Sequence, residues 1–221
     1  MHNIVNNLLS IQSEIKLKIN ELNFKNYQPN IVAVSKTFSM QDILPLINHG
    51  HIHFGENKVQ EAIEKWTNLK NDFKHLKLHM VGKLQTNKVK YAVPLFDYIH
   101  SVDNIKLAEK ISKEQIKNNK KMKLFIQINI GNENQKSGIL IDQLDNFYNK
   151  CTNDLGLNVI GLMCLPPNDN KSQIYFSKMK ELVRKLQLKD ISMGMSNDYL
   201  EAINYQSTYL RIGSKIFGER N

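Results

Sequence analysis

Lys36 follows a short apolar run and is the residue of this sequence best placed for covalent chemistry. The run IVAV, residues 31 to 34, is followed by Ser35 and Lys36. Four consecutive apolar residues are typical of a strand buried on both faces, as in a parallel sheet, so this amine is expected at the rim of a core. A desolvated lysine loses its proton readily, and the neutral amine is the nucleophile that forms Schiff bases with carbonyl compounds. The alternative is an ordinary lysine that extends into solvent from a strand end.

Small hydroxyl residues and glycine recur in two segments near the carboxyl end. Ser196 lies in SMGMSND, and Gly213 and Ser214 lie in STYLRIGSKIFGER. Glycine lets backbone amides approach an anion closely, and the start of a helix favours negative charge. Each segment alone is also typical of an ordinary turn. Together with Lys36, the two segments predict a pocket for a phosphorylated aldehyde.

The elements that must bring these residues together alternate regularly along the chain. Short apolar runs separated by helical patterns predict a parallel sheet of eight strands, at residues 31–35, 52–54, 77–81, 97–101, 122–130, 157–162, 189–192 and 208–212. Helix starts are indicated at Ser39 and Asp103, and His49 and Gly50 close the first of these helices. The pattern predicts a single (β/α)8 TIM-type barrel over residues 1–221, with an extra amino-terminal helix. An open doubly wound sheet is the alternative, but it lacks the Gly-rich turn expected after its first strand.

A TIM-type barrel would also explain the spacing of the reactive residues. Catalytic and binding groups of such barrels project from the carboxyl ends of the strands, and the loops after strands seven and eight often hold phosphate. Lys36 follows the first predicted strand, Ser196 follows the seventh, and Gly213 and Ser214 follow the eighth. These residues are therefore expected on one face of the barrel.

The amino-terminal segment predicts an amphipathic helix and no targeting sequence. Its apolar residues are spaced three and four apart, from Ile4 to Leu22, as in a helix with one apolar stripe. It lacks the basic start, apolar stretch and cleavage site of a signal peptide, and the chain has no apolar run of membrane-spanning length, so we expect a cytoplasmic protein. Cys151 and Cys164 have no metal-type spacing and are expected to be free, buried thiols.

The net charge of +9 could attract nucleic acid, but the sequence favours a solvated surface. Lys117, Lys120, Lys121 and Lys123 form the densest basic cluster, where a helix ends and a strand begins. Aromatic residues are not interleaved with it, and no nucleic-acid motif is recognised. His51 and His53 alternate along a strand, yet a metal site would need further ligands. We therefore expect neither nucleic-acid binding nor a metal.

Eight ordered segments of the sequence resemble one family. They are VAVSKT, FGENKVQE, LHMVGKLQTNKVK, IHSVDNIKLAEKI, IQINIGNENQKSGI, GLMCLPP, SMGMSNDYLEAI and STYLRIGSKIFGER. The chain resembles the pyridoxal phosphate homeostasis proteins, single-domain relatives of the amino-terminal barrel of alanine racemase. One departure lies at Gln206, where that family usually has glycine.

The resemblance implies a site for pyridoxal 5′-phosphate (PLP). Lys36 would form the Schiff base with the aldehyde. The phosphate would be held by Ser196, Gly213 and Ser214, and Arg211 would approach the pyridine nitrogen. Asn57 would lie near the ring, and the family motif places His79 close to the site.

The resemblance also implies a carrier in place of an enzyme. Arginine cannot accept the proton that a pyridine nitrogen needs for ring protonation, so Arg211 predicts a poor electron sink. Racemisation needs acid and base groups on both faces of the α-carbon, and no tyrosine here lies in a matching motif. We expect a monomeric, non-catalytic protein that holds PLP and passes it to apo forms of PLP-dependent enzymes. The alternatives are an amino-acid racemase, an aldolase-like barrel and a nucleic-acid binder.

Overall fold

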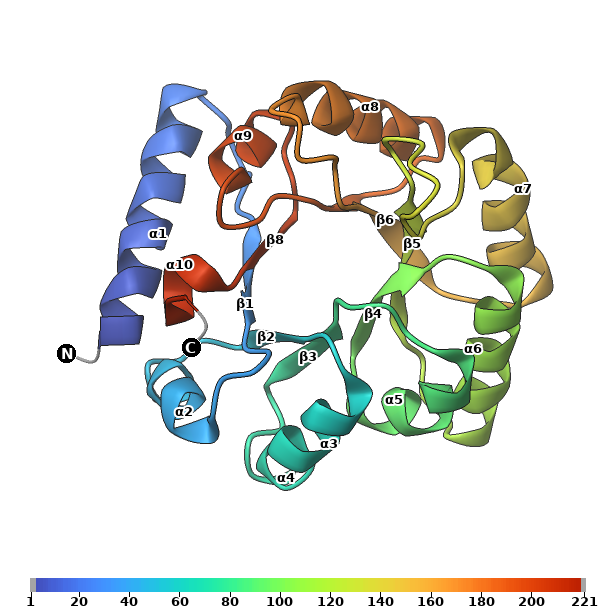
Figure 1. Cartoon of the computed structure of the whole chain (residues 1–221), viewed down its shortest axis with the longest axis horizontal. Helices are drawn as coiled ribbons and strands as arrows, with labels where there is room; N and C mark the ends of the chain where they lie inside the picture. Colours follow the sequence, from blue (N-terminus) through green and yellow to red (C-terminus); the bar gives the residue numbers. More distant parts are fainter. Residues whose placement is uncertain (1–2, 220–221) are drawn as a thin grey trace.

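A computed structural model describes residues 3–219, in which eight parallel strands close into a barrel in sequence order (Figure 1). β1 pairs with β2 on one side and with β8 on the other, which closes the ring. The strands are β1 (Asn30–Val34), β2 (His53–Glu56), β3 (Lys77–Met80), β4 (Tyr98–Val102), β5 (Lys123–Ile128), β6 (Val159–Cys164), β7 (Asp190–Ser192) and β8 (Tyr209–Ile212). All eight predicted strands are confirmed, with ends that shift by one or two residues.

The first strand is buried on both faces, as its apolar run predicts. Ile31 and Ala33 belong to the core between the strands and the outer helices, whereas Val32 and Val34 belong to a separate cluster that fills the barrel interior. This alternation follows from the two-residue period of a strand. It leaves the next residues of the chain, Ser35 and Lys36, at the carboxyl end of the barrel.

Helices surround the barrel on the outside (Figure 1). They are α1 (Asn3–Glu21), α2 (Met40–Asn48), α3 (Val59–Trp66), α4 (Leu69–Asp72), α5 (Val89–Leu95), α6 (Ile105–Lys117), α7 (Leu144–Asn149), α8 (Ser172–Lys185), α9 (Tyr199–Asn204) and α10 (Ser214–Phe217), with short 3-10 helices at Thr86–Lys88 and Ile141–Gln143 and a π-helical segment at Lys150–Asp154. Ser39 precedes α2 as predicted. The predicted start at Asp103 is one residue early, because Asn104 caps α6 by accepting the backbone N–H of Leu107 at 2.9 Å.

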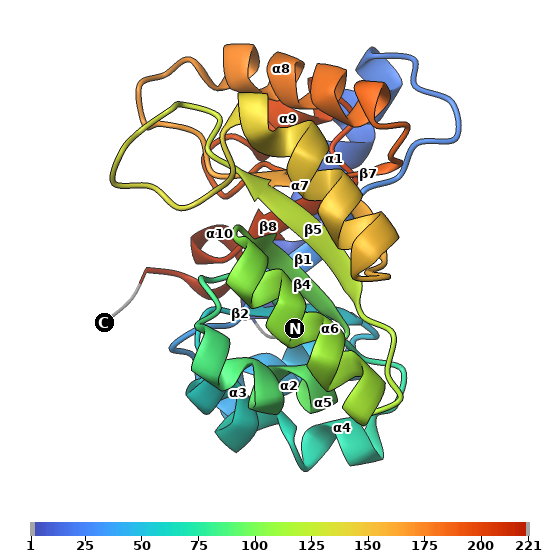
Figure 2. The ribbon, with the colours of Figure 1, turned by 90° about the vertical axis from the view of Figure 1, so that its right-hand side faces the viewer.

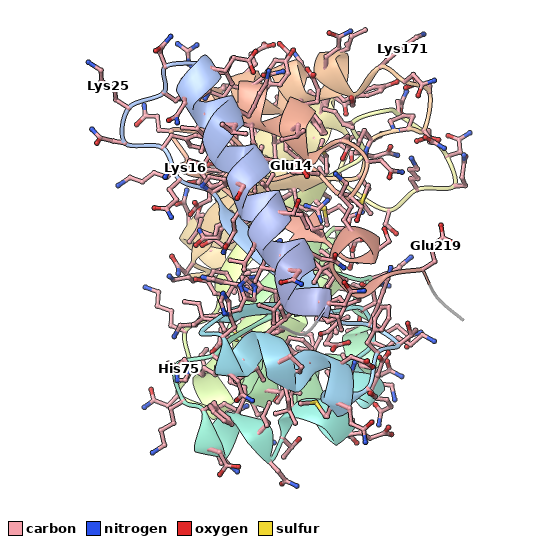
Figure 3. All side chains as sticks on the ribbon, turned by 90° about the vertical axis from the view of Figure 1, so that its left-hand side faces the viewer. Glu14, Lys16, Lys25, His75, Lys171 and Glu219 are labelled. Carbon is pink, nitrogen blue, oxygen red and sulfur yellow. The ribbon has the colours of Figure 1, made fainter. Side chains whose placement is uncertain are left out.

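The extra amino-terminal helix covers the outside of the barrel where β1 and β8 meet (Figures 1 and 3). Ile4, Leu8, Ile11 and Ile15 are buried on one side of α1, so the predicted apolar stripe is confirmed. On another side Glu14 accepts the hydroxyl of Tyr199 and lies 3.4 Å from the Lys215 ammonium. α1 therefore supports α9 and α10, the two helices that follow the serine and glycine loops.

Two long loops project from the carboxyl end of the barrel (Figure 2). One follows β5 and the other follows β6, and they touch where the Lys136 ammonium donates to the carbonyl of Pro166 at 3.1 Å. Cys151 and Cys164 are buried free thiols, as predicted. Within residues 3–219 no helix is both long and apolar enough to cross a membrane.

Candidate functional site

A cavity of about 1020 Å³ opens at the carboxyl ends of the strands. Six of the seven residues that the sequence singles out line it, namely Lys36, Asn57, Ser196, Arg211, Gly213 and Ser214. The barrel fold brings them together from the segments after β1, β2, β7 and β8, with Arg211 on β8 itself. Another cavity, of about 780 Å³, lies beside α1 near His49, His51 and His53, but none of the seven lines it.

The backbone on both sides of Lys36 is held by groups from β2 and α3. The Ser35 hydroxyl donates to Glu56 at 2.8 Å, and the Ser35 carbonyl accepts the Lys65 ammonium at 2.9 Å. After Lys36, the backbone N–H of Thr37 donates to Glu61 at 2.5 Å. These bonds fix the turn that carries the amine.

Thr37 itself adopts a strained conformation. Its φ of 69° lies in the left-handed region, which a β-branched residue rarely occupies. Strain of this kind persists only where surrounding contacts determine the conformation, and it is concentrated at functional sites. The bond from Thr37 to Glu61 supplies such a contact. The backbone conformation at Thr37, held by Glu61, therefore helps to determine the position of Lys36.

Glu56 is a buried carboxylate directly beneath this turn. One of its oxygens accepts the Trp66 indole at 3.0 Å as well as the Ser35 hydroxyl, and lies 2.7 Å from the Lys65 ammonium. The other oxygen, Oε2, has no hydrogen-bond partner. Burial raises the pKa of Glu56, and Lys65 opposes that shift. Glu56 is the last residue of β2 and lies before the start of α3, so it is not placed to interact favourably with the dipole of that helix.

Arg211 is a buried cation at the floor of the cavity. Its guanidinium donates to the Ser192 hydroxyl at 2.5 Å and to the Cys164 carbonyl at 2.8 Å, and only 4% of the residue is exposed. Burial lowers the pKa of Arg211, and the nearby Cys164 and Asp198 oppose that shift. The ordinary arginine pKa lies so far above neutrality that the group stays charged. Arg211 can therefore donate hydrogen bonds to a ligand and cannot accept one.

The serine and glycine loops lie side by side at another part of the wall. The Ser196 hydroxyl accepts the backbone N–H of Lys215 at 3.4 Å, which joins the loop after β7 to the start of α10. The backbone N–H of Arg211 donates to the Gly194 carbonyl at 2.9 Å, which joins the same loop to β8. Hydroxyls and backbone N–H groups at such a junction suit an anion.

Asn57 reaches the cavity because Gly82 has no side chain. A Cβ on Gly82 would lie 2.4 Å from the Asn57 carbonyl oxygen and 2.7 Å from its Cα. Both residues line the cavity. The close approach of the segments after β2 and β3 therefore depends on this glycine.

His79 does not line the cavity. It is fully buried in the barrel interior on β3, where its ring nitrogens lie 2.9 Å from His53 and 2.9 Å from His100. Burial, with smaller contributions from neighbouring histidines, lowers its pKa well below 6.5. Its link to the site is indirect, because His100 bonds Ser192, which bonds Arg211.

Several lining residues were not singled out from the sequence. They include Lys83, Gln127, Lys136 and Asp198. Ser192 and Cys164 were missed as partners of Arg211, although both end barrel strands, which is the signal that could have found them. The lysines were missed because the sequence has too many for type alone to be informative. Among residues 3–219 no cluster of His, Cys, Asp or Glu could hold a metal ion.

Comparisons with known proteins agree with this fold. A family model described as alanine racemase, N-terminal domain, matches residues 13–221. A protein of Haemophilus influenzae named pyridoxal phosphate homeostasis protein is 36% identical over 229 residues, covering 99% of this chain and 97% of that protein. The structure of PipY from Synechococcus elongatus with PLP bound matches with a TM-score of 0.80 and 30% identity, covering 92% of this chain and 100% of PipY. Alanine racemase from Clostridium difficile, at 15% identity and a TM-score of 0.71 over 99% of this chain and 57% of the racemase, shares the fold alone.

Proposed function

The chain belongs to the pyridoxal phosphate homeostasis protein family, and we propose that it binds PLP in the barrel cavity through a Schiff base on Lys36, to store, protect and deliver it without catalytic turnover. One observation carries this proposal. A single cavity combines an amine in a backbone-determined position, a buried guanidinium, and two loops of serine and glycine. PLP has an aldehyde, a pyridine nitrogen and a phosphate, and each of these groups has a counterpart there.

The residues present fit the cofactor group by group. Lys36 would bind the aldehyde carbon and release water. Ser196, Gly213 and Ser214 would bind the phosphate, while Arg211 would donate to the pyridine nitrogen and Asn57 would lie near the ring. Lys36, Lys83, Lys136 and Arg211 bring four basic groups to the cavity against Asp198 and Glu219, which favours an anion. When bound, PLP supplies an electrophilic carbon that can be held covalently and released again.

Two features of the cavity support a carrier over a racemase. Arg211 can only donate to the ring, so it does not keep the pyridine nitrogen protonated, and carbanion chemistry is disfavoured. No tyrosine or histidine is found among the cavity-lining residues of the described chain. A second acid or base opposite Lys36, of the kind racemisation requires, would have to be one of the other lysines, Asp198 or Glu219.

Absorption spectroscopy with matched lysine variants tests the binding proposal. Wild-type protein mixed with PLP should show a visible band that borohydride bleaches. Lys36→Ala should abolish the band, whereas Lys83→Ala, which removes another cavity amine, should retain it. A band that survives in Lys36→Ala, or no band in the wild type, would refute the Schiff base at Lys36. A colourless wild type would instead favour the aldolase-like alternative.

Turnover assays distinguish the carrier from the racemase. The PLP-loaded protein should leave single-enantiomer amino acids unchanged, yet restore activity to an apo form of a PLP-dependent enzyme mixed with it. Sustained racemisation that disappears in Lys36→Ala would overturn the carrier proposal. Failure to restore the apo-enzyme would leave binding but refute delivery.

A further inference from the structure

A line of hydrogen bonds crosses the barrel interior from Arg211 toward its opposite mouth. The Arg211 guanidinium lies 2.5 Å from Ser192 Oγ, which lies 2.8 Å from Nδ1 of His100. Nε2 of His100 is 2.9 Å from Nδ1 of His79, and Nε2 of His79 is 2.9 Å from Nδ1 of His53. Five strands, β8, β7, β4, β3 and β2, each contribute one member, and the step from Ser192 on β7 to His100 on β4 joins strands that are not neighbours in the barrel.

The chemistry of Arg211 and Ser192, at one end of this line, fixes the direction of its hydrogen bonds. Arginine can only donate, so Ser192 Oγ accepts from Arg211. A serine hydroxyl has one hydrogen, and the other partner of Ser192 in the structure is Nδ1 of His100. The hydroxyl therefore donates to Nδ1, which places the proton of a neutral His100 on Nε2. The reverse direction would leave a buried hydroxyl hydrogen without an acceptor, which is costly.

The direction of the first hydrogen bond also sets the direction of the next two, between the histidine rings. Nε2–H of His100 donates to Nδ1 of His79, so His79 is protonated on Nε2 and donates in turn to Nδ1 of His53. Burial lowers the pKa of both His79 and His100 well below 6.5, which is consistent with neutral rings. All three histidines are then the same tautomer.

This arrangement compensates the buried charge of Arg211. Among residues 3–219 no carboxylate lies within ion-pair distance of Arg211, so its charge is not neutralised by a salt bridge. A buried charge needs compensation by hydrogen bonds or dipoles. The oxygen of Ser192 and the lone-pair side of each imidazole all face toward Arg211, so their dipoles add.

Aromatic rings keep the imidazoles in this orientation. His79 stacks on Tyr98 with ring centroids 4.1 Å apart, and His100 stacks on Phe125 at 4.3 Å. A carboxylate in place of the line would neutralise Arg211 and weaken its interaction with a ligand. The dipoles of the neutral serine and histidine side chains stabilise the guanidinium without cancelling its positive charge.

We propose that Ser192, His100 and His79 are positioning residues for Arg211. Their hydrogen bonds all run in one direction, orient the buried guanidinium toward the pyridine nitrogen, and compensate its charge in place of a carboxylate. The part that concerns the pyridine rests on the proposed function. The direction of the hydrogen bonds does not, since it follows from the protein alone.

Nuclear magnetic resonance of the wild-type protein tests the direction. Long-range ¹H–¹⁵N spectra of protein labelled at histidine, with His79 and His100 assigned through single His→Gln variants, report which ring nitrogen carries the proton. Both rings should be neutral and protonated on Nε2 at neutral pH. A proton on Nδ1, or on both nitrogens, of either ring would overturn the proposal. This result does not depend on PLP binding.

PLP titrations of variants test the positioning role. Ser192→Ala should raise the Kd for PLP roughly tenfold or more and shift the visible band, because the charged guanidinium of Arg211 loses the hydroxyl that accepts its hydrogen bond. Ser192→Thr, which restores the hydroxyl, should recover most of the affinity and the wild-type band. His51→Gln, outside this line of hydrogen bonds, is the matched control and should leave both unchanged. A Ser192→Ala variant with the affinity and visible band of the wild type would refute the positioning role. A wild type that binds no PLP would refute the proposed function, and the direction of the hydrogen bonds would then be tested by the resonance experiment alone.

Discussion

At the scale of single residues, burial decides which groups are charged. His51 illustrates this: its Nε2 donates to the His53 carbonyl at 2.9 Å, and burial lowers its pKa to about 4. Arg211 stays charged in the barrel interior because its intrinsic pKa is so high. The barrel interior therefore holds a permanent cation, Arg211, among neutral histidine rings, beside the cavity that Lys36 lines.

The pKa of His51 predicts a pH-dependent contribution to stability. An unfolded histidine binds a proton near pH 6.5, whereas His51 in the folded protein does so only near pH 4. Between these values the unfolded chain binds one more proton, so the free energy of unfolding falls as the pH falls. His51→Gln keeps a donor for the His53 carbonyl and removes this titration. Its free energy of unfolding should fall less steeply than that of the wild type, by about 1.4 kcal/mol per pH unit.

Urea unfolding of the two proteins at about pH 6 and about pH 5 measures this difference within the window between the two pKa values. The comparison between variant and wild type cancels the contributions of other groups, including Glu56, whose raised pKa acts in the opposite direction. If the free energy of unfolding changed equally with pH in the two proteins, the lowered pKa of His51 would be contradicted.

At the scale of elements, the loops after the strands are positioned by close backbone contacts. Gly82, between β3 and the following turn, touches the backbone of Asn57 after β2. α9 ends in a Schellman arrangement, in which Ser207 N–H donates to the Ala202 carbonyl at 3.1 Å and Gln206 N–H donates to the Ile203 carbonyl at 2.9 Å. Gln206 has a φ of 57° there, a conformation that favours glycine.

Gly82→Ala should therefore displace the cavity wall. The added Cβ meets backbone atoms that cannot rotate away, so we expect a loss of about 1–3 kcal/mol in stability and weaker PLP binding. Gly156→Ala is the control, because its Cβ meets nothing within 4 Å and its φ of 61° brings backbone strain alone. It should lower stability and leave the Kd for PLP unchanged. Equal Kd values for Gly82→Ala and the wild type would show that Asn57 does not depend on Gly82.

Gln206→Gly should stabilise the protein. Glycine removes the cost of the left-handed conformation, on the order of 1 kcal/mol, although it loses the hydrogen bond between Gln206 and the Lys180 ammonium. Gln206→Ala separates the two effects, since it loses the same bond and keeps the strain. In thermal unfolding, the melting temperature of Gln206→Gly should be higher than that of the wild type, and that of Gln206→Ala should be lower. A glycine variant less stable than the wild type would show that the Lys180 contact outweighs the strain.

At the scale of the whole molecule, a closed barrel joins residues distant in sequence into one site, so ligand binding and folding are coupled. Lys36 and Ser214 lie on the segments after the neighbouring strands β1 and β8. PLP bound between them should stabilise the folded state by about 2.7 kcal/mol when its concentration is 100 times Kd. Unfolding curves with and without PLP measure this, with Lys36→Ala as the control. A wild type that PLP leaves no more stable would contradict binding at this site.

Most of the barrel could be predicted from the sequence, together with Lys36, Ser196, Gly213 and Ser214 in the cavity, because strand periodicity and the carboxyl-end rule depend on local pattern. The apolar run before Lys36 and the serine and glycine loops are such local signals. Asn57 and Arg211 were predicted from the resemblance to the family. The line from Arg211 through Ser192 and His100 could not be predicted, since it depends on which inward-facing side chains of five strands meet inside the barrel. The strained Thr37 was missed for a similar reason, because Glu61, the group that holds it, is distant in sequence.

The central claim is that Lys36 is the amine that binds the aldehyde of PLP. Borohydride reduction of the PLP-loaded protein, followed by proteolysis and mass spectrometry, makes the attachment permanent and locates it among the lysines. The account predicts one reduced adduct of PLP, on the peptide that contains Lys36, and none on the peptides of Lys83 or Lys136. An adduct confined to any other lysine would contradict it.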